Sequence, residues 1–318
     1  MKTLYAFALA VFCSTNTATA QDFPNKTIRF IVPYSAGGGT DSVARLTGAY
    51  MSTALGQQVV VENKPGASAN IGTEAVARST PDGYTVLVTA PNFTTSEALF
   101  DKLTWKLDDF IPVSHLVRYA NVLVAAPNTP FSGVGQMIEA AKAKPGALSF
   151  GSAGTGSNAH LAMALLSQRA GIDIPHIPYK GSAPLKTDLL GDHVPLGVDG
   201  LGGLSDLINT GKLKALAVLT PKRSPLAPNI PSLGDIGIND VDGNGWYGAL
   251  VPASTPPAIV ARLNAAFSAA LEAPEIRERL IAMGVEPVGG SSQDFLAYLV
   301  GERAKWAKVI STGKIKAE

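Results

Sequence analysis

Cysteine is almost absent from the 318-residue sequence. Its single copy, Cys13, lies in a segment typical of a removable signal peptide, so we expect the mature chain to contain none. This absence excludes a disulfide framework, a thiol nucleophile and a thiolate metal site. Histidine is scarce as well, with four copies and no H-x-x-x-H or H-E-x-x-H spacing. We therefore expect neither a metal ion nor a cofactor.

An excess of charge of one sign is also missing. Lys and Arg number 26 against 25 Asp and Glu, and loss of Lys2 with the signal peptide would make the two counts equal. A neutral chain argues against nucleic acid or an anionic membrane surface as a partner. After residue 20, no run approaches the ~20 apolar residues of a membrane-spanning helix. With 46% hydrophobic residues, the chain should form a globular core, and we expect a monomer.

Residues 1–20 are typical of a secretory signal peptide. Lys2 supplies a thin basic start, residues 4–13 form an apolar run, and the Ala-Thr-Ala of residues 18–20 is a small-residue cleavage site. We therefore expect cleavage near Ala20 and a location in the bacterial periplasm.

Glycine, in contrast, is abundant at 32 residues, and it gathers in two loops. The first loop, residues 33–41, follows a β-like run and precedes a helical pattern that begins near Asp41. The second loop, residues 151–158, leads from a β-like run into a helix expected over about 159–169. Glycine lets backbone N–H groups approach a ligand, and a helix N-terminus adds unpaired donors and a partial positive charge. Both loops are therefore candidate sites for an anion.

The chain alternates β-like runs with amphipathic helical patterns, as parallel α/β proteins do. β-like runs are expected at residues 27–32, 58–62, 84–88, 111–117, 121–126, 148–150, 174–179, 194–199, 213–219 and 246–251. We expect two lobes with a ligand cleft between them, each a βα sheet with helices on both faces. Residues 21–122 plus 246–318 should form lobe 1, and residues 123–245, including the return crossover, should form lobe 2.

Two other functions compete with simple binding. The second loop matches the dinucleotide pattern G-x-G-x-x-A, but the following strand does not end in an acidic residue, which argues against a nicotinamide cofactor. A secreted serine hydrolase using Ser157 or Ser152 with His160 is the alternative from the enzyme class. The sequence contains no G-x-S-x-G nucleophile elbow, so we favour a partly buried structural role for His160 and no catalysis.

Several motifs in order carry a resemblance to a known family over nearly the whole mature chain. These motifs are residues 33–41 (PYSAGGGTD), 62–67 (ENKPGA), 81–85 (PDGYT), 154–157 (GTGS) with 160–161 (HL), 178–181 (PYKG), 199–200 (DG) and 221–224 (PKRS). With them, the chain resembles the Bug-type extracytoplasmic receptors of tripartite tricarboxylate transporters. The resemblance implies a two-lobed, type II periplasmic-binding-protein-like fold that closes on a small carboxylate. It also implies delivery to the membrane components of a transporter. A sensor subunit that presents the bound ligand from the same pocket is an alternative function.

The resemblance also implies contact residues. Carried over position by position, they are Tyr34, Ala36, Gly37, Gly38 and Asp41 in lobe 1, and Thr155, Gly156, Ser157 and Asp199 in lobe 2. From the same loops and strand ends we add Ser35, Gly154, His160 and Tyr179.

Asn92 and Phe93 follow a strand end, and we expect them to shape the distal end of the pocket. An aromatic side chain there would favour a flat ring. We therefore place an aromatic carboxylate beside aliphatic dicarboxylates as the expected ligand.

Overall fold

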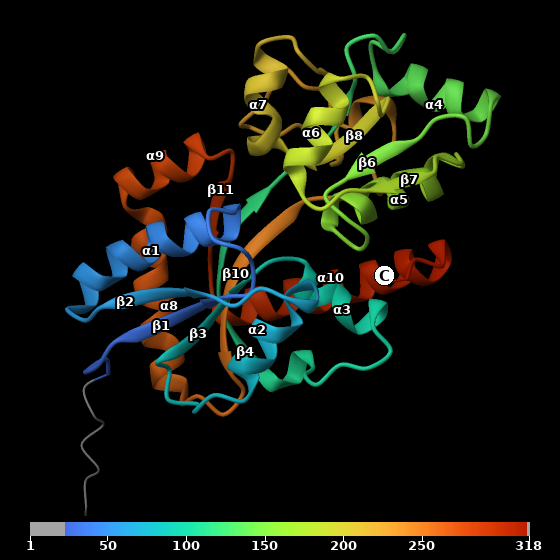
Figure 1. Ribbon diagram of the computed structural model, residues 1–318. Helices are drawn as coiled ribbons and strands as arrows, with labels where there is room; N and C mark the ends of the chain where they lie inside the picture. Colours follow the sequence, from blue (N-terminus) through green and yellow to red (C-terminus); the bar gives the residue numbers. More distant parts are fainter. Residues whose placement is uncertain (1–22, 317–318) are drawn as a thin grey trace, which may run out of the picture.

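The computed structural model describes residues 23–316 and has two lobes, each built on one β-sheet (Figure 1). The sheet of the first lobe has the order β11-β4-β10-β3-β1-β2. Its strands are β1 (Ile28–Val32), β2 (Val59–Asn63), β3 (Thr85–Thr89), β4 (Phe110–Tyr119), β10 (Gly245–Pro252) and β11 (Glu286–Gly289). Strands β1, β2 and β3 pair in parallel, whereas β10 runs antiparallel between β3 and β4.

The sheet of the second lobe has the order β7-β6-β8-β5-β9. Its strands are β5 (Asn121–Ala125), β6 (Phe150–Ser152), β7 (His176–Pro178), β8 (Leu196–Gly200) and β9 (Lys214–Val218). Strand β6 pairs in parallel with β7 and β8, and β5 is antiparallel to both β8 and β9. The predicted alternation of strands and helices is thus realised twice.

Helices cover both faces of each sheet. The first lobe carries α1 (Gly39–Leu55), α2 (Asn70–Ala77), α3 (Asn92–Leu99), α8 (Pro257–Glu272), α9 (Pro274–Ala282) and α10 (Ser292–Gly313). The second lobe carries α4 (Val134–Ala143), α5 (Asn158–Ala170), α6 (Ser182–Leu190) and α7 (Leu201–Asn209). Short 3₁₀ turns lie at Ala67–Ala69, Leu107–Asp109 and Gly234–Ile236.

The two-faced covering follows from strand geometry, because successive side chains point to opposite faces of a sheet. In β1, Phe30 packs in one cluster with Phe267 of α8, whereas Ile31 packs in another with Phe295 of α10. A continuous apolar run therefore marks a strand that is buried on both sides.

Helix α3 is an element that the sequence pattern does not predict. Its run of Asn, Thr and Ser has low intrinsic helix propensity and no clear apolar stripe. Tertiary packing stabilises it, since Phe93, Thr94, Thr95 and Ser96 are all buried. Within residues 23–316, no helix is both long and apolar enough to cross a membrane.

The chain passes between the lobes at Ala120 and again over residues 219–244, and α10 forms a third link. The first half of α10 packs in the core of lobe 1 through Phe295 and Leu299. Its second half packs in the core of lobe 2 through Trp306 and Ile310. In Figure 1, α10 runs from the first sheet to the underside of the second lobe. The expected lobe ranges stay a prediction. They assign all of residues 246–318 to lobe 1 and do not include the packing of α10 against lobe 2.

Candidate functional site

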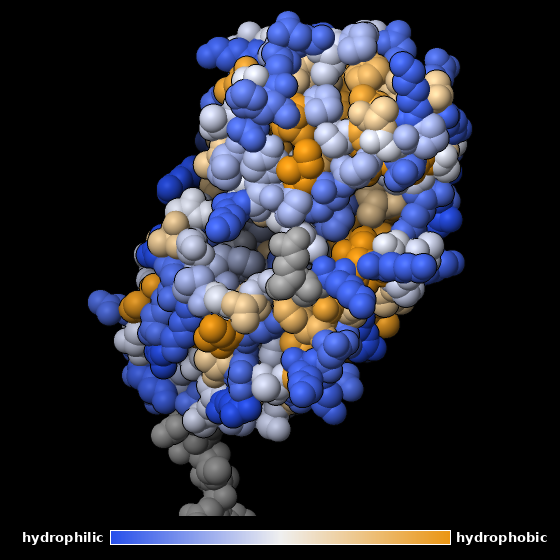
Figure 2. Space-filling model, turned by 45° about the vertical axis from the view of Figure 1, so that its right-hand side comes forward, coloured by the Kyte–Doolittle hydropathy of each residue, from blue (hydrophilic) through white to orange (hydrophobic). Residues whose placement is uncertain are grey.

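A cavity of about 650 Å³ lies between the lobes. Tyr34 and Gly38 line it from the first lobe, and Ser157 and Asp199 line it from the second. A neighbouring cavity of about 530 Å³ shares Tyr34 and Ser157 with it. Figure 2 shows the molecule hollowed between its upper and lower parts. Both predicted glycine loops thus face one continuous cleft.

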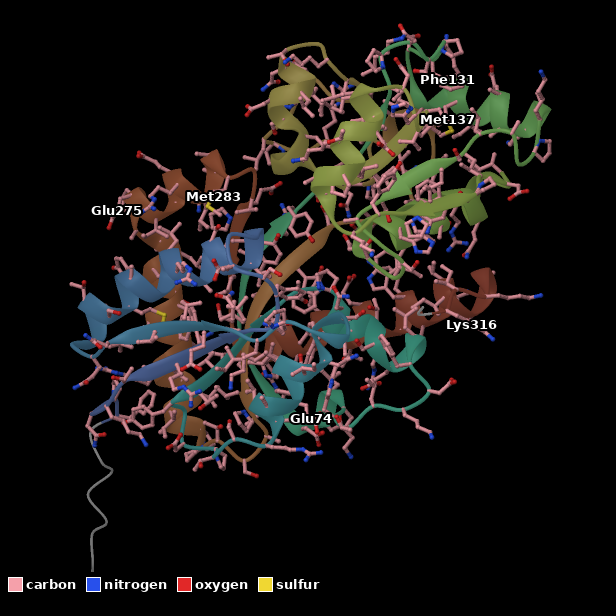
Figure 3. The ribbon with its side chains drawn as sticks, in the orientation of Figure 1. Glu74, Phe131, Met137, Glu275, Met283 and Lys316 are labelled. Atoms are coloured by element: carbon pink, nitrogen blue, oxygen red, sulfur yellow. The ribbon has the colours of Figure 1, made fainter. Side chains whose placement is uncertain are left out.

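The lobes also meet directly at one side of the larger cavity. Met283, labelled in Figure 3, lies between α9 and β11 and lines this cavity. Across the cleft, a methyl group added at Gly202 of α7 would lie 2.2 Å from the carbonyl oxygen of Met283. Only a residue without a side chain fits there, so Gly202 allows the backbones of the two lobes to approach closely.

Five helices begin at the wall of the larger cavity. The residues that cap or open α1, α3, α5, α6 and α7 are Gly38, Asn92, Ser157, Ser182 and Gly200, and all of them line it. The first N–H groups of a helix lack partners within the helix, and the helix dipole places positive charge at this end. The cavity therefore attracts an anion through backbone groups.

Asp41 holds the first glycine loop in place. Its carboxylate accepts hydrogen bonds from the Gly37 N–H at 2.9 Å, from Nε of Arg45 at 2.9 Å and from Nδ2 of Asn63 at 2.9 Å. Burial alone would raise the pKa of Asp41, but the bonds from Arg45, Gly37 and Asn63 outweigh it and lower the pKa. Asp41 lines neither cavity, and its hydrogen bond from the Gly37 N–H positions the loop.

Ser157 closes the second glycine loop as the N-cap of α5. Its Oγ accepts a hydrogen bond from the backbone N–H of His160 at 3.2 Å. Gly154 and Gly156 have φ angles of 138° and 74°, which L-residues rarely adopt. The loop can therefore turn sharply enough to bring Ser157 to both cavities.

Two tyrosines that sequence reasoning missed complete the wall. Tyr119 ends β4 and Tyr247 lies near the start of β10, and their ring centroids are 5.1 Å apart. Burial raises the pKa of Tyr247 to about 12, and the nearby charge of Asp199 adds to this shift. Each tyrosine lies next to a lobe crossing, which is the sequence signal that could have found it.

Asp199 is the one charged side chain among the described residues that line the larger cavity. Its Oδ1 accepts a hydrogen bond from the Gly200 N–H at 2.8 Å. Its Oδ2 is buried and has no hydrogen-bond partner within the described part of the chain. Burial raises the pKa of Asp199, against the lowering effects of Ser182, the Gly200 N–H and Lys186.

A family comparison decides what kind of protein has this cleft. Residues 43–315 match the model of the tripartite tricarboxylate transporter family receptor, TctC. The chain belongs to this family. The predicted resemblance is therefore confirmed. TctC-family proteins are periplasmic solute-binding receptors, while the predicted signal peptide lies outside the described residues.

Solved structures agree with the family and with the predicted two-lobed fold. The chain is similar to Rpa4515 of R. palustris, solved with adipate, at 34% identity and a TM-score of 0.83 over 93% of this chain and 99% of that one. It is similar to the periplasmic binding protein BugD at 32% identity and a TM-score of 0.80 over 93% and 100%. It is also similar to MatC of Rhodopseudomonas palustris, solved with malate, at 30% identity and a TM-score of 0.79 over 91% and 100%.

The receptor brings many of the predicted site residues to the cleft. Those that line the larger cavity are Tyr34, Gly37, Gly38, Asn92, Ser157 and Asp199. Those that line the neighbouring cavity include Ser35, Gly154 and Thr155. Residues that line neither cavity are Ala36, Asp41, Phe93, Gly156, His160 and Tyr179.

Phe93 is a clear correction, because the structure turns it away from the cleft. Its side chain is 2% exposed and stacks on Trp105 with ring centroids 5.1 Å apart. Phe110 meets the same ring edge-on at 5.2 Å. Phe93 therefore belongs to the hydrophobic core of lobe 1 and does not shape the pocket.

Tyr179 and Gly156 also line neither cavity, and each contacts another residue of the protein. The Tyr179 hydroxyl donates to Oδ2 of Asp188 at 2.8 Å. A methyl group added at Gly156 would lie 2.6 Å from Cδ1 of Leu99 in α3, so the loop packs tightly there. Tyr179 is thus held within lobe 2, whereas Gly156 lets the second loop approach α3 of lobe 1 closely.

His160 supports the second loop from behind. Its Nδ1 accepts a hydrogen bond from the Gly156 N–H at 3.0 Å, and its ring stacks on His176 with centroids 3.7 Å apart. The hydrolase alternative needs the imidazole beside Ser157 or Ser152, and within residues 23–316 neither hydroxyl bonds to it. Nε2 of His176 lies 2.7 Å from Oγ of Ser152, but Ser152 is fully buried and cannot reach a substrate.

The histidine pair predicts acid sensitivity of folding. Burial lowers the pKa of His160 to about 4, and burial together with the charge of His160 lowers the pKa of His176 to about 3. Because the unfolded chain binds these protons near pH 6.5, the stabilisation is complete above that pH. It is lost as the pH falls to about 4 for His160 and to about 3 for His176. We expect the free energy of unfolding to drop by up to about 1.4 kcal/mol per pH unit for each neutral histidine.

Urea unfolding at pH 7, 6, 5 and 4.5 measures this slope. His160→Gln should flatten it, since a glutamine oxygen can accept from the Gly156 N–H without titrating. His193→Gln, at an exposed histidine, is the matched control and should keep the slope of the parent protein. Equal slopes for the parent and His160→Gln would contradict the assignment.

Proposed function

We propose that this receptor captures a small carboxylate in the periplasm and passes it, unchanged, to the membrane components of a tripartite tricarboxylate transporter. The observation that carries the proposal is the interlobe cavity at which five helices begin. Each helix end contributes about 0.3–1 kcal/mol to an anion, and up to ~2 kcal/mol when partly buried. Micromolar affinity corresponds to about 8 kcal/mol, so hydrogen bonds and burial of the ligand must add to these terms.

We propose an aliphatic acid before an aromatic one as the ligand. Rpa4515 and MatC, whose structures hold adipate and malate, share the fold at 30–34% identity. The aromatic alternative rested on Phe93, which lies in the core. Aliphatic mono- and dicarboxylates are therefore the first compounds to test.

A thermal-shift screen of such acids tests the proposal. Ligand at 100 times its dissociation constant stabilises the folded state by about 2.7 kcal/mol, which should raise the melting temperature by roughly 5 °C or more. Isothermal titration calorimetry then gives the affinity of the best acid. Absence of a shift with every acid, together with turnover of an ester by purified protein, would overturn the proposal in favour of the hydrolase.

A further inference from the structure

The two chain crossings between the lobes are joined to each other. Nδ2 of Asn121 donates a hydrogen bond to the carbonyl oxygen of Gly243 at 2.7 Å. The Leu219 N–H donates to the carbonyl oxygen of Asn121 at 2.8 Å, and the Gly243 N–H donates to the carbonyl oxygen of Leu219 at 2.8 Å. These bonds bind the crossings into a single hinge, about which two lobes joined in this way can rotate.

Helix α10, the third link between the lobes, is anchored in both of them. In lobe 1, Phe295 packs edge-on against Trp246 with ring centroids 5.6 Å apart. In lobe 2, the indole of Trp306 is fully buried, and Nε2 of Gln168 in α5 donates to the carbonyl oxygen of Val309 at 3.0 Å. Sliding of α10 along either lobe would pull large side chains out of a close-packed core, which is costly. A rotation of the lobes must therefore deform α10 itself.

Gly301 lies in the stretch of α10 between these anchors. Leu299, two residues before it, packs in the core of lobe 1, and Trp306, five residues after it, packs in the core of lobe 2. Gly301 is exposed, and a methyl group added there would meet no atom within 4 Å. Packing therefore does not require a glycine, although glycine weakens a helix interior more than any residue except proline. Its position makes α10 easiest to bend where the helix passes from one lobe to the other.

The polar contacts that follow Gly301 agree with a bend at this residue. Nζ of Lys305 donates to the carbonyl oxygen of Asp242 at 2.9 Å, which ties the second half of α10 to the return crossing. The ion pair that reaches back from Arg303 to Glu97 of α3 has a distance of 3.4 Å and is partly exposed, so it contributes little. This pair can lengthen at low cost when α10 bends.

We propose that α10 bends at Gly301 when the lobes rotate about the joined crossings, and that this glycine sets how readily the lobes change their relative position. An alanine at this position would favour the regular helix, which spans Ser292–Gly313 in the structure, over a bent one. The inference goes beyond the proposed function, because it concerns the motion of the protein and not its ligand.

Two pairs of spin labels test this by pulsed electron paramagnetic resonance on the mature chain, since the described residues contain no cysteine that would react with the labels. Gln293→Cys with Lys308→Cys, both exposed, measures the distance between the two halves of α10. Ala75→Cys with Thr187→Cys, also exposed, measures the distance between α2 of lobe 1 and α6 of lobe 2. We expect more than one distance for each pair in the parent protein. Gly301→Ala should reduce the population with a bent α10 about fivefold and narrow the interlobe distribution with it.

Gly135→Ala is the matched control. Gly135 lies in α4, within lobe 2 alone, and also has nothing within 4 Å of an added methyl group. Both substitutions should raise the urea concentration at the midpoint of unfolding, as alanine does when it replaces glycine in a helix. Only Gly301→Ala should change the two distance distributions.

Three results would overturn the inference: a single α10 distance in the parent protein, unchanged distributions in Gly301→Ala, or an equal change in Gly135→Ala. A change in the α10 distance without one in the interlobe distance would also count against it, because the bend would then not accompany the rotation. All of these measurements are made without a ligand, so their failure leaves the proposed function standing.

Discussion

Gly38→Leu should weaken binding of the tightest carboxylate from the screen by at least about 100-fold, which is about 2.7 kcal/mol, while the protein stays folded. Gly38 caps α1 with φ −73° and ψ 167°, an extended conformation that any residue adopts. A methyl group added there meets its nearest neighbour, the Ser35 carbonyl oxygen, at 3.4 Å, which is an ordinary contact distance. A leucine side chain would therefore fit the backbone and occupy the space of the ligand.

Gly133→Leu is a close control for this substitution. Gly133 caps α4 with φ −167° and ψ 163°, has nothing within 4 Å of an added methyl group, and lines neither cavity. Both variants lose a favourable glycine N-cap, so urea unfolding should show a similar small loss of stability in each. Calorimetry should show a loss of affinity in Gly38→Leu alone. Full affinity in Gly38→Leu would show that the ligand does not approach the N-terminus of α1.

Trp306→Ala should lower the free energy of unfolding by about 3–5 kcal/mol, because it leaves a large cavity in the core of lobe 2. The indole is fully buried, and its Nε1 donates to Oε2 of Glu302 at 2.8 Å. Glu302 is itself 5% exposed and pairs with Lys305. Removing the indole therefore also takes a hydrogen bond from a buried carboxylate, which adds to the cost.

Two further variants separate the parts of this effect. Trp306→Phe keeps much of the volume but loses the donor to Glu302, so we expect a smaller loss of about 1–3 kcal/mol. Leu296→Ala changes a 41% exposed side chain on the same helix and should cost about 0.5 kcal/mol or less. Urea unfolding followed by circular dichroism measures all three. A loss below about 1 kcal/mol in Trp306→Ala would show that α10 does not stabilise lobe 2.

The amino-acid sequence by itself determined the α/β class and the two glycine loops. Local patterns carry this information: apolar runs mark two-sided strands, and glycines before a helical stripe mark strand-to-helix turns. Several motifs in order, with those of the two loops among them, also identified the receptor family, which residues 43–315 confirm. The sequence predicted an anion site made from helix N-termini, and no Lys or Arg is among the described residues that line the larger cavity.

Only the tertiary structure decided which side chains of these segments face the cleft. Phe93 follows a strand end just as a pocket residue would, but Trp105 and Phe110 draw it into the core. Tyr119 and Tyr247 lie 128 positions apart, and they meet because β4 and β10 are neighbours in one sheet. Similarly, α10 begins in the core of lobe 1 and stabilises lobe 2 through Trp306, which packs in the core of that lobe. The direction of a side chain depends on partners far along the chain, which local sequence patterns do not record. The first glycine loop was therefore found from sequence, and the surface that it turns to the cleft was found only from the fold.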